Sequence, residues 1–434
     1  MLHILKHYAI TKLRRFHDRA HLEAWQHRKV IKHLYKIVSK SPFYSKLYLG
    51  LDFQKWTEFP IIDKKQMMEN FNSLNTVGID KGNAFEIALE AERTREFTPK
   101  INDITVGLSS GTSGNRGIFL ASTQEREEWA GILLAKLLPE PIYSKQEIAL
   151  FMRANSNLYE TTRSRRIHYQ FYDLMQPIEN HLRDLNCTPP SILVAPPSML
   201  RILGKELVKG TLYIKPRKII SIAEVLDPLD ETYIQKGFGQ QVHQIYQCTE
   251  GFLGSTCSFG TLHINEDVVV IQKEYIDANR SKFVPIITDF RRHSQPIIRY
   301  RLNDILTESK NVCPCGSCFL SLEKVEGRCD DIVHLPGLLT LNQFIPIFPD
   351  YIRNAITDVS TEIEEYSVLQ MDEGCLEIAV KTRSPIDIKP QIRNSLEILC
   401  YKMRCQMPKL HFIPYKPPEI GQKLRRIRSQ FTVT

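Results

Sequence analysis

Short apolar runs alternate with helix-like stretches between residues 104 and 330, and this alternation constrains the fold more than any other feature of the sequence. The runs lie at 148–152, 191–195, 218–223 and 242–246. Apolar runs with β-branched residues, each followed by a turn and a helical pattern, are typical of βαβ units with buried parallel strands. Ligands of such sheets bind outside the carboxyl ends of the strands, so we expect function in the loops after these runs.

The segments before residue 104 and after residue 330 have hydrophobic patterns that differ from this alternation. Residues 1–100 read as helical, and Asp63 is expected to cap the helix that begins after it. Beyond residue 331 two strand patterns stand between two helical ones, which predicts a small α+β domain. The predicted fold class is α/β, with a large N-terminal domain that has mainly parallel sheets and a small, mobile α+β C-terminal domain. The predicted parts are a helical preface (1–100), an α/β core (101–329) and a lid domain (330–434).

Composition narrows the class of protein. The chain has 434 residues, 42% of them hydrophobic, which excludes a disordered chain. Ten cysteines in a chain of this length favour a reducing, cytoplasmic location. Charges interrupt the basic N-terminus too often for a transmembrane span or a signal peptide, and a solvated surface helix is favoured there over membrane docking. The net charge of +8 would attract phosphorylated ligands, anionic membrane surfaces or nucleic acid and does not choose among them. A nucleic-acid binder is not favoured, because it would rest on the basic tail at 423–428 and the cysteines, and no strand carries the aromatic platform that a single-strand binder needs.

The first candidate site is a loop of glycines and hydroxyl residues at 107–117. Its backbone amides and hydroxyls can surround a polyphosphate. It is neither a Walker loop nor a dinucleotide-binding Gly-x-Gly-x-x-Gly. The alternative is an ordinary surface loop, because turn residues also cluster for conformational reasons.

The second candidate follows the strand pattern at 242–246. Tyr246 can stack on a purine, Thr249 can reach a phosphate, and Glu250 can hold Mg²⁺. Ala223 and Glu224 end another strand pattern and could border the same base. The alternative is a core tyrosine beside a surface glutamate.

The third candidate lies near the boundary between the predicted domains. Asp304 follows an apolar run and can accept both hydroxyls of a ribose, and Arg328 could follow a ligand when domains move. The alternative is a cluster of surface salt bridges.

In this order the motifs resemble the adenylate-forming superfamily of acyl-CoA synthetases, and within it the phenylacetate-CoA ligase branch with its relatives that adenylylate a deazaflavin coenzyme. The segments 40–44 and 59–64 are also similar to that branch. The resemblance implies that Glu250 holds Mg²⁺, that Asp304 binds the ribose of ATP, and that Asp330 is the hinge of the lid. It implies ATP binding by Ser109, Ser110, Gly111, Thr112, Ser113, Gly114, Ala223, Glu224, Tyr246, Thr249, Asp304 and Arg328.

Two departures from the family pattern and one weak match stand out. Asn115 replaces the usual lysine of the phosphate loop, which leaves Arg116 as its only adjacent cation, and Gln247 replaces a glycine. Lys423, in Gly421-Gln422-Lys423, resembles the lysine that supplies adenylation, although the usual lead-in is missing.

Cysteine and histidine form two clusters, at 257–263 and at 313–318. Thiolates and an imidazole at this spacing favour a closed, structural Zn²⁺ site, and the alternative is a set of buried free thiols. The resemblance implies the ligands Cys257, His263, Cys313 and Cys315, with Cys318 competing for the fourth position.

The expected activity is ATP-dependent conversion of a carboxylic acid, aryl or similarly compact, to an acyl adenylate with release of pyrophosphate. Transfer to a thiol follows, either coenzyme A or the arm of a carrier protein. One alternative is an adenylyltransferase that leaves AMP on a small-molecule hydroxyl, and another is a non-catalytic binding protein with a decayed site. The sequence decides neither the acid nor the oligomeric state.

Overall fold

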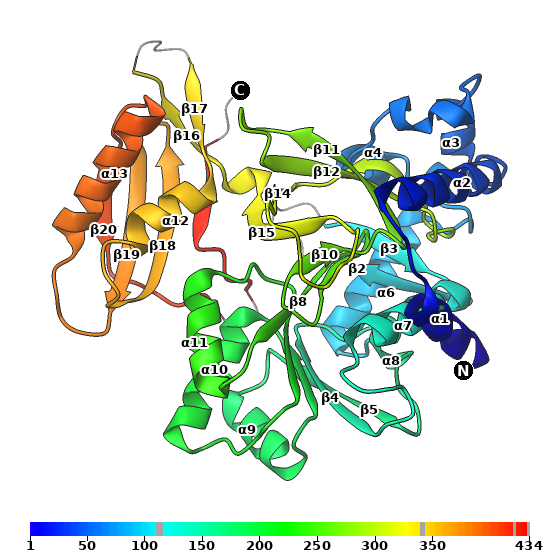
Figure 1. Ribbon diagram of the computed structural model, residues 1–434, viewed down its shortest axis with the longest axis horizontal. Helices are drawn as coiled ribbons and strands as arrows, with labels where there is room; N and C mark the ends of the chain where they lie inside the picture. Colours follow the sequence, from blue (N-terminus) through cyan, green and yellow to red (C-terminus); the bar gives the residue numbers. More distant parts are fainter. Residues whose placement is uncertain (110–115, 339–342, 420–421, 432–434) are drawn as a thin grey trace. The chain divides into compact units, whose positions relative to one another are not determined.

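The computed structural model describes residues 1–109, 116–338, 343–419 and 422–431 (Figure 1). The chain forms two compact units. The larger contains residues 1–226, 230–302 and 306–324, and the smaller contains 227–229, 303–305 and 325–434. The predicted lid domain, residues 330–434, falls within the smaller unit.

The first hundred residues are helical, as the sequence predicts. Asp63 caps α4 as expected, because its carboxylate accepts the Gln66 backbone N–H at 2.8 Å and the Gln66 side chain accepts the Asp63 N–H at 3.2 Å. The segments are α1 (Leu2–Leu13), α2 (Arg19–Val38), α3 (Pro42–Leu47), the 3₁₀ helix η1 (Phe53–Glu58), α4 (Lys64–Glu69), α5 (Phe71–Leu74) and α6 (Lys81–Thr94).

Helix α1 packs closely against α7 (Thr123–Leu137) (Figure 1). Gly131 of α7 permits this approach, since a Cβ there would lie 2.5 Å from the Ile4 carbonyl oxygen. Among the described helices even the 20-residue α2 is too polar for a bilayer, and none has both the length and the hydrophobicity of a membrane span.

Parallel strands form one half of the main sheet, in the order β8-β7-β6-β4-β5. The four apolar runs at 148–152, 191–195, 218–223 and 242–246 coincide with β4, β6, β7 and β8, so the predicted βαβ core is confirmed. The strands are β4 (Gln146–Met152), β5 (Ile167–Asp173), β6 (Ile192–Ala195), β7 (Lys218–Ser221) and β8 (Val242–Cys248). The helices between them are α8 (Asn157–Glu160), α9 (Ile178–Cys187), α10 (Pro197–Lys209) and α11 (Pro228–Phe238).

The other half of the main sheet is antiparallel. Strand β8 is parallel to β7 and antiparallel to β9, so the turn that carries Thr249 and Glu250 lies where the sheet changes type. The strands are β9 (Gly251–Thr256), β10 (Leu262–Ile264), β11 (Val269–Tyr275), β12 (Lys282–Asp289), β13 (Ile297–Arg301), β14 (Asp304–Glu308) and β15 (Ser321–Arg328).

A separate three-stranded sheet carries the predicted phosphate loop. It contains β1 (Lys100–Ile101), β2 (Ile104–Leu108) and β3 (Ile118–Ala121), and the loop connects β2 to β3. Gly107 faces Phe119 across the pair, and a Cβ at Gly107 would lie 2.1 Å from the Phe119 ring. The hairpin register therefore depends on a glycine at the start of the candidate loop.

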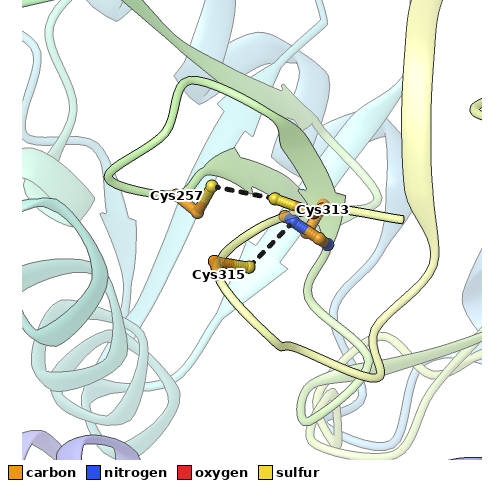
Figure 2. Close-up of side chains that lie close together, drawn as sticks. Cys257, Cys313 and Cys315 are labelled. Atoms are coloured by element: carbon orange, nitrogen blue, oxygen red, sulfur yellow. Dashed lines mark hydrogen bonds between the residues drawn. The ribbon is translucent and has the colours of Figure 1, made fainter. Parts of the chain in front are cut away.

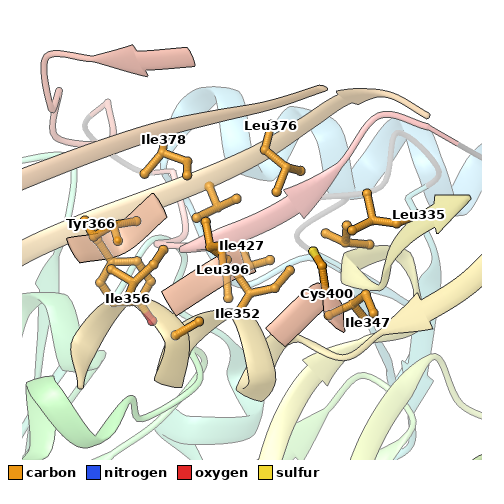
Figure 3. Close-up of a cluster of buried hydrophobic side chains, with 14 of the residues drawn as sticks. Leu335, Ile347, Ile352, Ile356, Tyr366, Leu376, Ile378, Leu396, Cys400 and Ile427 are labelled. Atoms are coloured by element: carbon orange, nitrogen blue, oxygen red, sulfur yellow. The ribbon is translucent and has the colours of Figure 1, made fainter. Parts of the chain in front are cut away.

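The smaller unit is the α+β domain that the sequence predicts. Its sheet has the order β20-β19-β18-β21, and Tyr366 and Ile427 of this sheet share one buried cluster with Leu396 of α13 (Figure 3). Its elements are the 3₁₀ helix η2 (Cys329–Asp331), β16 (Val333–Pro336), β17 (Phe344–Ile347), α12 (Pro349–Thr357), β18 (Ile363–Asp372), β19 (Cys375–Thr382), α13 (Lys389–Met403), β20 (Lys409–Ile413) and β21 (Ile427–Ser429).

Candidate active site and metal centre

The neck of the candidate phosphate loop is closed by two hydrogen bonds. The Ser109 backbone N–H donates to the Gly117 carbonyl oxygen at 2.8 Å, and the Gly117 N–H donates to the Ser109 Oγ at 2.7 Å. These two bonds hold Ser109 and Gly117, the residues on either side of the loop, next to each other at the end of the β2–β3 hairpin. The loop's predicted phosphate ligands Ser110, Gly111, Thr112, Ser113 and Gly114 lie outside the described residues.

The cation next to this loop in the sequence has a different partner. Arg116 Nη2 donates to Glu92 Oε1 at 2.5 Å, and Arg116 Nε donates to the Ser109 carbonyl oxygen at 3.1 Å. A second cation comes from the N-terminal helices: Lys64 Nζ lies 3.4 Å from Ser109 Oγ. Lys64 belongs to the segment 59–64, and no motif in the sequence marks this lysine as a functional residue.

The candidate magnesium ligand Glu250 is held by two hydroxyl groups. Thr249 Oγ1 donates to Glu250 Oε2 at 2.9 Å, and the Tyr300 hydroxyl donates to Glu250 Oε1 at 3.1 Å. Burial, reinforced by the negative charge of Glu250, raises the pKa of Tyr300 far above its ordinary value, so the phenol keeps its proton. Each carboxylate oxygen keeps further lone pairs for a cation.

A single segment joins the two candidate motifs. Ile62 pairs with Tyr300 in a parallel bridge: the Ile62 N–H donates to the Arg299 carbonyl oxygen at 3.0 Å, and the Arg301 N–H donates to the Ile62 carbonyl oxygen at 2.8 Å. Lys64 stands two residues further along this segment, so the chain that contacts the loop neck also packs beside the tyrosine that holds Glu250.

Two side chains between β12 and β13 brace the same region. Arg292 Nη1 donates to the Thr249 carbonyl oxygen at 2.8 Å. Gln295, which is 1% exposed, accepts the Leu120 N–H at 2.9 Å and donates to the Ile118 carbonyl oxygen at 3.0 Å. These bonds connect the turn after β8 to β3 of the loop hairpin, and no motif in the sequence pointed to either residue.

The end of β7 has a strained backbone. Ala223 adopts φ +70°, and the Glu224 N–H donates to the Ile222 carbonyl oxygen at 2.9 Å. A hydrogen bond across one residue of positive φ defines the rare γ-turn, which is unfavourable for a residue with a side chain. Strain of this kind clusters at functional sites, and it occurs here at Ala223, one of the two residues predicted to border the adenine.

Tyr246, which was predicted to stack on the adenine, lies in β8 of the larger unit and is buried. The remaining predicted nucleotide-site and lid residues lie in the smaller unit. Asp304 begins β14 and Arg328 ends β15. Asp330 accepts a hydrogen bond from Asn303 Nδ2 at 2.7 Å at the predicted hinge. Gly327 adopts φ +144°, which a residue with a side chain rarely does. Lys423 is half-buried on the C-terminal tail.

Four of the five predicted metal ligands converge (Figure 2). The ligand atoms of Cys257, His263, Cys313 and Cys315 all lie within 4.8 Å of one another, and Cys318 is not in this group. Cys257 Sγ lies 3.6 Å from Cys313 Sγ, and Cys315 Sγ lies 3.4 Å from His263 Nε2. Thiolates on a tetrahedral Zn²⁺ at about 2.3 Å are about 3.8 Å apart, so these separations fit one ion.

The histidine of this cluster is oriented for coordination. Its Nδ1 lies 3.1 Å from the Phe319 carbonyl oxygen, so Nδ1 carries the proton and Nε2 presents its lone pair to the cysteines. Burial raises the pKa of the Cys313 thiol, but hydrogen bonds that include those from Thr261 and the Cys315 backbone outweigh it and lower the pKa to about 6. The cluster can therefore supply a thiolate near neutral pH.

Comparisons with known proteins agree with this architecture. The solved structure of 2-hydroxyisobutyryl-CoA ligase in its postadenylation state, in complex with R3-HIB-AMP, superposes with a TM-score of 0.69 at 14% identity, over 95% of this chain and 90% of that one. The chain has the fold of the adenylate-forming enzymes. The GH3.15 acyl acid amido synthetase has a TM-score of 0.56 at 12% identity, over 87% of this chain and 81% of that one. The fold implied by the sequence motifs is thus confirmed.

Similarity in sequence is weaker than similarity in fold. The phenylacetate-coenzyme A ligase of Thermus thermophilus is 21% identical over 214 residues. The match covers 44% of this chain and 44% of that relative's own length. No family profile matches the chain.

Proposed function

We propose that the protein is an ATP-dependent acid–thiol ligase. A substrate carboxylate attacks the α-phosphorus of ATP, pyrophosphate leaves, and an acyl adenylate forms. A thiol, for which coenzyme A is the first candidate, then attacks the acyl carbon, and AMP leaves. The adenylate-forming fold and the complexes of a structural neighbour with 2-HIB-AMP and CoA support this reaction class.

One observation carries the proposal. The segment Ile62–Lys64 pairs with Tyr300, which donates to Glu250, and also contacts Ser109 at the neck of the candidate phosphate loop. The sequence predicts that these two motifs bind one triphosphate, and both motifs contact the same segment of the chain. In the proposed reaction Glu250 would hold Mg²⁺ against the phosphates, with the carboxylate oriented by its two hydroxyl donors.

The residues of the smaller unit have proposed roles by resemblance. Asp304 binds the ribose, Lys423 stabilises the charge that develops on the α-phosphate, and Arg328 contacts the nucleotide. A turn of this unit about Asp330 after adenylation removes Lys423 and admits the thiol.

Carboxylate-dependent exchange of pyrophosphate into ATP tests this proposal. With Mg²⁺ and a panel of aryl, short hydroxylated and fatty acids, we expect exchange above background with one compact class of acid and a thioester when coenzyme A is added. A final product in which AMP is attached to a hydroxyl of a small molecule would instead identify an adenylyltransferase. Absence of ATP binding in calorimetry would overturn the proposal. It would favour the alternative of a non-catalytic protein whose nucleotide site has decayed.

We also propose a structural Zn²⁺ held by Cys257, His263, Cys313 and Cys315. Four protein ligands leave no open position for substrate, so the ion would brace β10 against the loop before β15 rather than take part in the reaction.

Removal of this ion should lower the melting temperature. An ion present at about a thousandfold excess over its Kd contributes about 4 kcal/mol, and roughly 2 °C per kcal/mol gives a loss of about 8 °C. Elemental analysis should find one zinc per chain in the wild type and none in Cys313→Ser, which should melt lower. The matched control Cys187→Ser changes an exposed cysteine and should retain zinc and stability. A wild-type protein purified without zinc, and unchanged by added zinc, would contradict the proposal.

A further inference from the structure

Helix α1 carries an apolar stripe on each of two faces. One stripe is covered, because Ile4 is buried in the same cluster as Ala130 of α7. The other stripe faces solvent: Leu2 is 86% exposed, Leu13 is 79% exposed and Leu5 is 40% exposed. One apolar stripe is enough to hold a surface helix on a core, so packing against α7 does not account for the second stripe.

The exposed leucines lie on one side of the helix. Leu5 follows Leu2 by three residues and precedes Leu13 by eight, which is the helical repeat, and the exposed Ala9 lies between them. In Figure 1 α1 lies at the outer edge of the larger unit, with α7 on its inner side. The sequence alone favours a solvated helix here, because it does not show which of the two stripes the core covers.

Positive charge flanks the exposed stripe. The first seventeen residues contain four lysine or arginine residues and no acidic residue. Lys6, Lys12 and Arg15 are exposed. Among the ion pairs of the described residues, none joins these three side chains to a carboxylate. This face of α1 therefore combines apolar side chains with cations that no described carboxylate neutralises.

The cations are concentrated at the C-terminal end of α1. Partial burial lowers the pKa of Lys12, and the positive charges of Arg15 and Lys136 lower it further. Burial and the charge of Lys12 lower the pKa of Lys218 to about 8. Lys136 is paired with Asp267 at 2.9 Å, but the other three lack such a partner among the described ion pairs. An anionic surface would relieve the repulsion within this group.

We propose that the outer face of α1, formed by Leu2, Leu5, Lys6, Lys12 and Leu13, docks on an anionic phospholipid surface. A helix that lies in a membrane interface buries its leucines at the boundary of the acyl chains, while its lysines extend to the lipid phosphates. A nucleic acid would use the cations and leave the leucines in water, so the combination favours a membrane. The inference does not depend on the proposed reaction.

Cosedimentation of the full-length protein with vesicles tests the inference. We expect at least about tenfold stronger binding to phosphatidylcholine vesicles that contain about 30% phosphatidylserine than to pure phosphatidylcholine, because each lysine near an anionic surface contributes roughly fivefold. Binding should weaken as the salt concentration rises, since salt screens exposed charges.

Paired variants separate the apolar contribution from the charges. Leu2→Ser with Leu13→Ser should weaken binding to the anionic vesicles by roughly tenfold or more, because two apolar anchors are lost. The matched control, Leu49→Ser with Val208→Ser, changes residues that are 82% and 74% exposed on other helical segments and should bind as the wild type does. All four changes are at exposed positions, so the melting temperature should be unchanged.

The lysines are tested in the same way. Lys6→Gln with Lys12→Gln should weaken binding to the anionic vesicles by roughly 10–25-fold and leave the weak binding to pure phosphatidylcholine unchanged. The control, Lys46→Gln with Lys55→Gln, removes two exposed lysines of the N-terminal region that lie outside α1 and should have no effect.

Three results would overturn the inference. The first is a wild-type protein that does not bind the anionic vesicles, or binds neutral vesicles equally well. The second is binding that both double variants of α1 retain, which would assign it to another surface. The third is binding that depends on the lysines but not on the leucines, together with tighter binding of a single-stranded oligonucleotide, which would identify a nucleic-acid surface. Because none of these measurements uses nucleotide or acid, the proposed function stands or falls separately.

Discussion

Replacement of Lys423 by alanine should reduce carboxylate-dependent ATP–pyrophosphate exchange by about 10²–10³-fold, the loss typical of one group that stabilises transition-state charge. Thiolysis of a supplied acyl adenylate should stay within about threefold of the wild-type rate, because in the proposed reaction the turn of the smaller unit removes Lys423 before the thiol attacks. Single-turnover assays of each half-reaction measure the two effects separately.

The smaller unit should remain folded in this variant. The tail after Lys423 is anchored by Arg425, whose guanidinium pairs with Asp331, and by Arg426, whose Nη1 donates to Glu365 at 2.9 Å. Strand β21 then pairs with β18. These contacts hold the tail on the C-terminal side of Lys423, and a melting curve of Lys423→Ala separates a loss of reactivity from a loss of stability.

Lys416→Ala is the matched control, since Lys416 is exposed on the same tail. It should leave both half-reactions unchanged. Equal losses of exchange and thiolysis in Lys423→Ala would refute the assignment of this lysine to adenylation alone.

The elements that the sequence predicts well are those with local periodicity. The apolar runs of β4, β6, β7 and β8 identified the parallel core, and alternating and helical patterns identified β18, β19 and α13. The metal cluster was also visible, because cysteine and histidine are uncommon and their spacing is diagnostic. The sequence left Cys315 and Cys318 as competing fourth ligands. The structure decides between them, because only Cys315 lies in the cluster with Cys257, His263 and Cys313.

The residues that the sequence did not reveal act through distant parts of the chain. Gln295 bonds to Ile118 and Leu120 through its side chain, and nothing in the local sequence marks a glutamine for that role. Lys64 reaches Ser109 only because Ile62 pairs with Tyr300, a pairing set by tertiary packing. Long-range pairing of this kind leaves no periodic signal in a single sequence.

Replacement of Glu250 by glutamine should reduce Mg²⁺-dependent exchange by at least about 100-fold, since the amide is neutral and coordinates Mg²⁺ poorly. Tyr300→Phe should have a smaller effect, a roughly 10-fold loss in apparent Mg²⁺ affinity, because it removes a group that orients the ligand rather than the ligand itself. Titration of exchange activity with Mg²⁺ gives both numbers. The exposed pair Glu179→Gln and Tyr213→Phe is the matched control and should titrate as the wild type does.

The pH dependence provides a further check on the tyrosine. Burial and the charge of Glu250 both raise the pKa of Tyr300, so the phenol stays protonated and continues to donate its hydrogen bond throughout the range from about pH 6 to 9. The ratio of wild-type to Tyr300→Phe activity should therefore be constant across this range. A ratio that falls as the pH rises would mean that the phenol loses its proton. A Glu250→Gln variant that responds to Mg²⁺ as the wild type does would contradict the placement of the cation on this carboxylate.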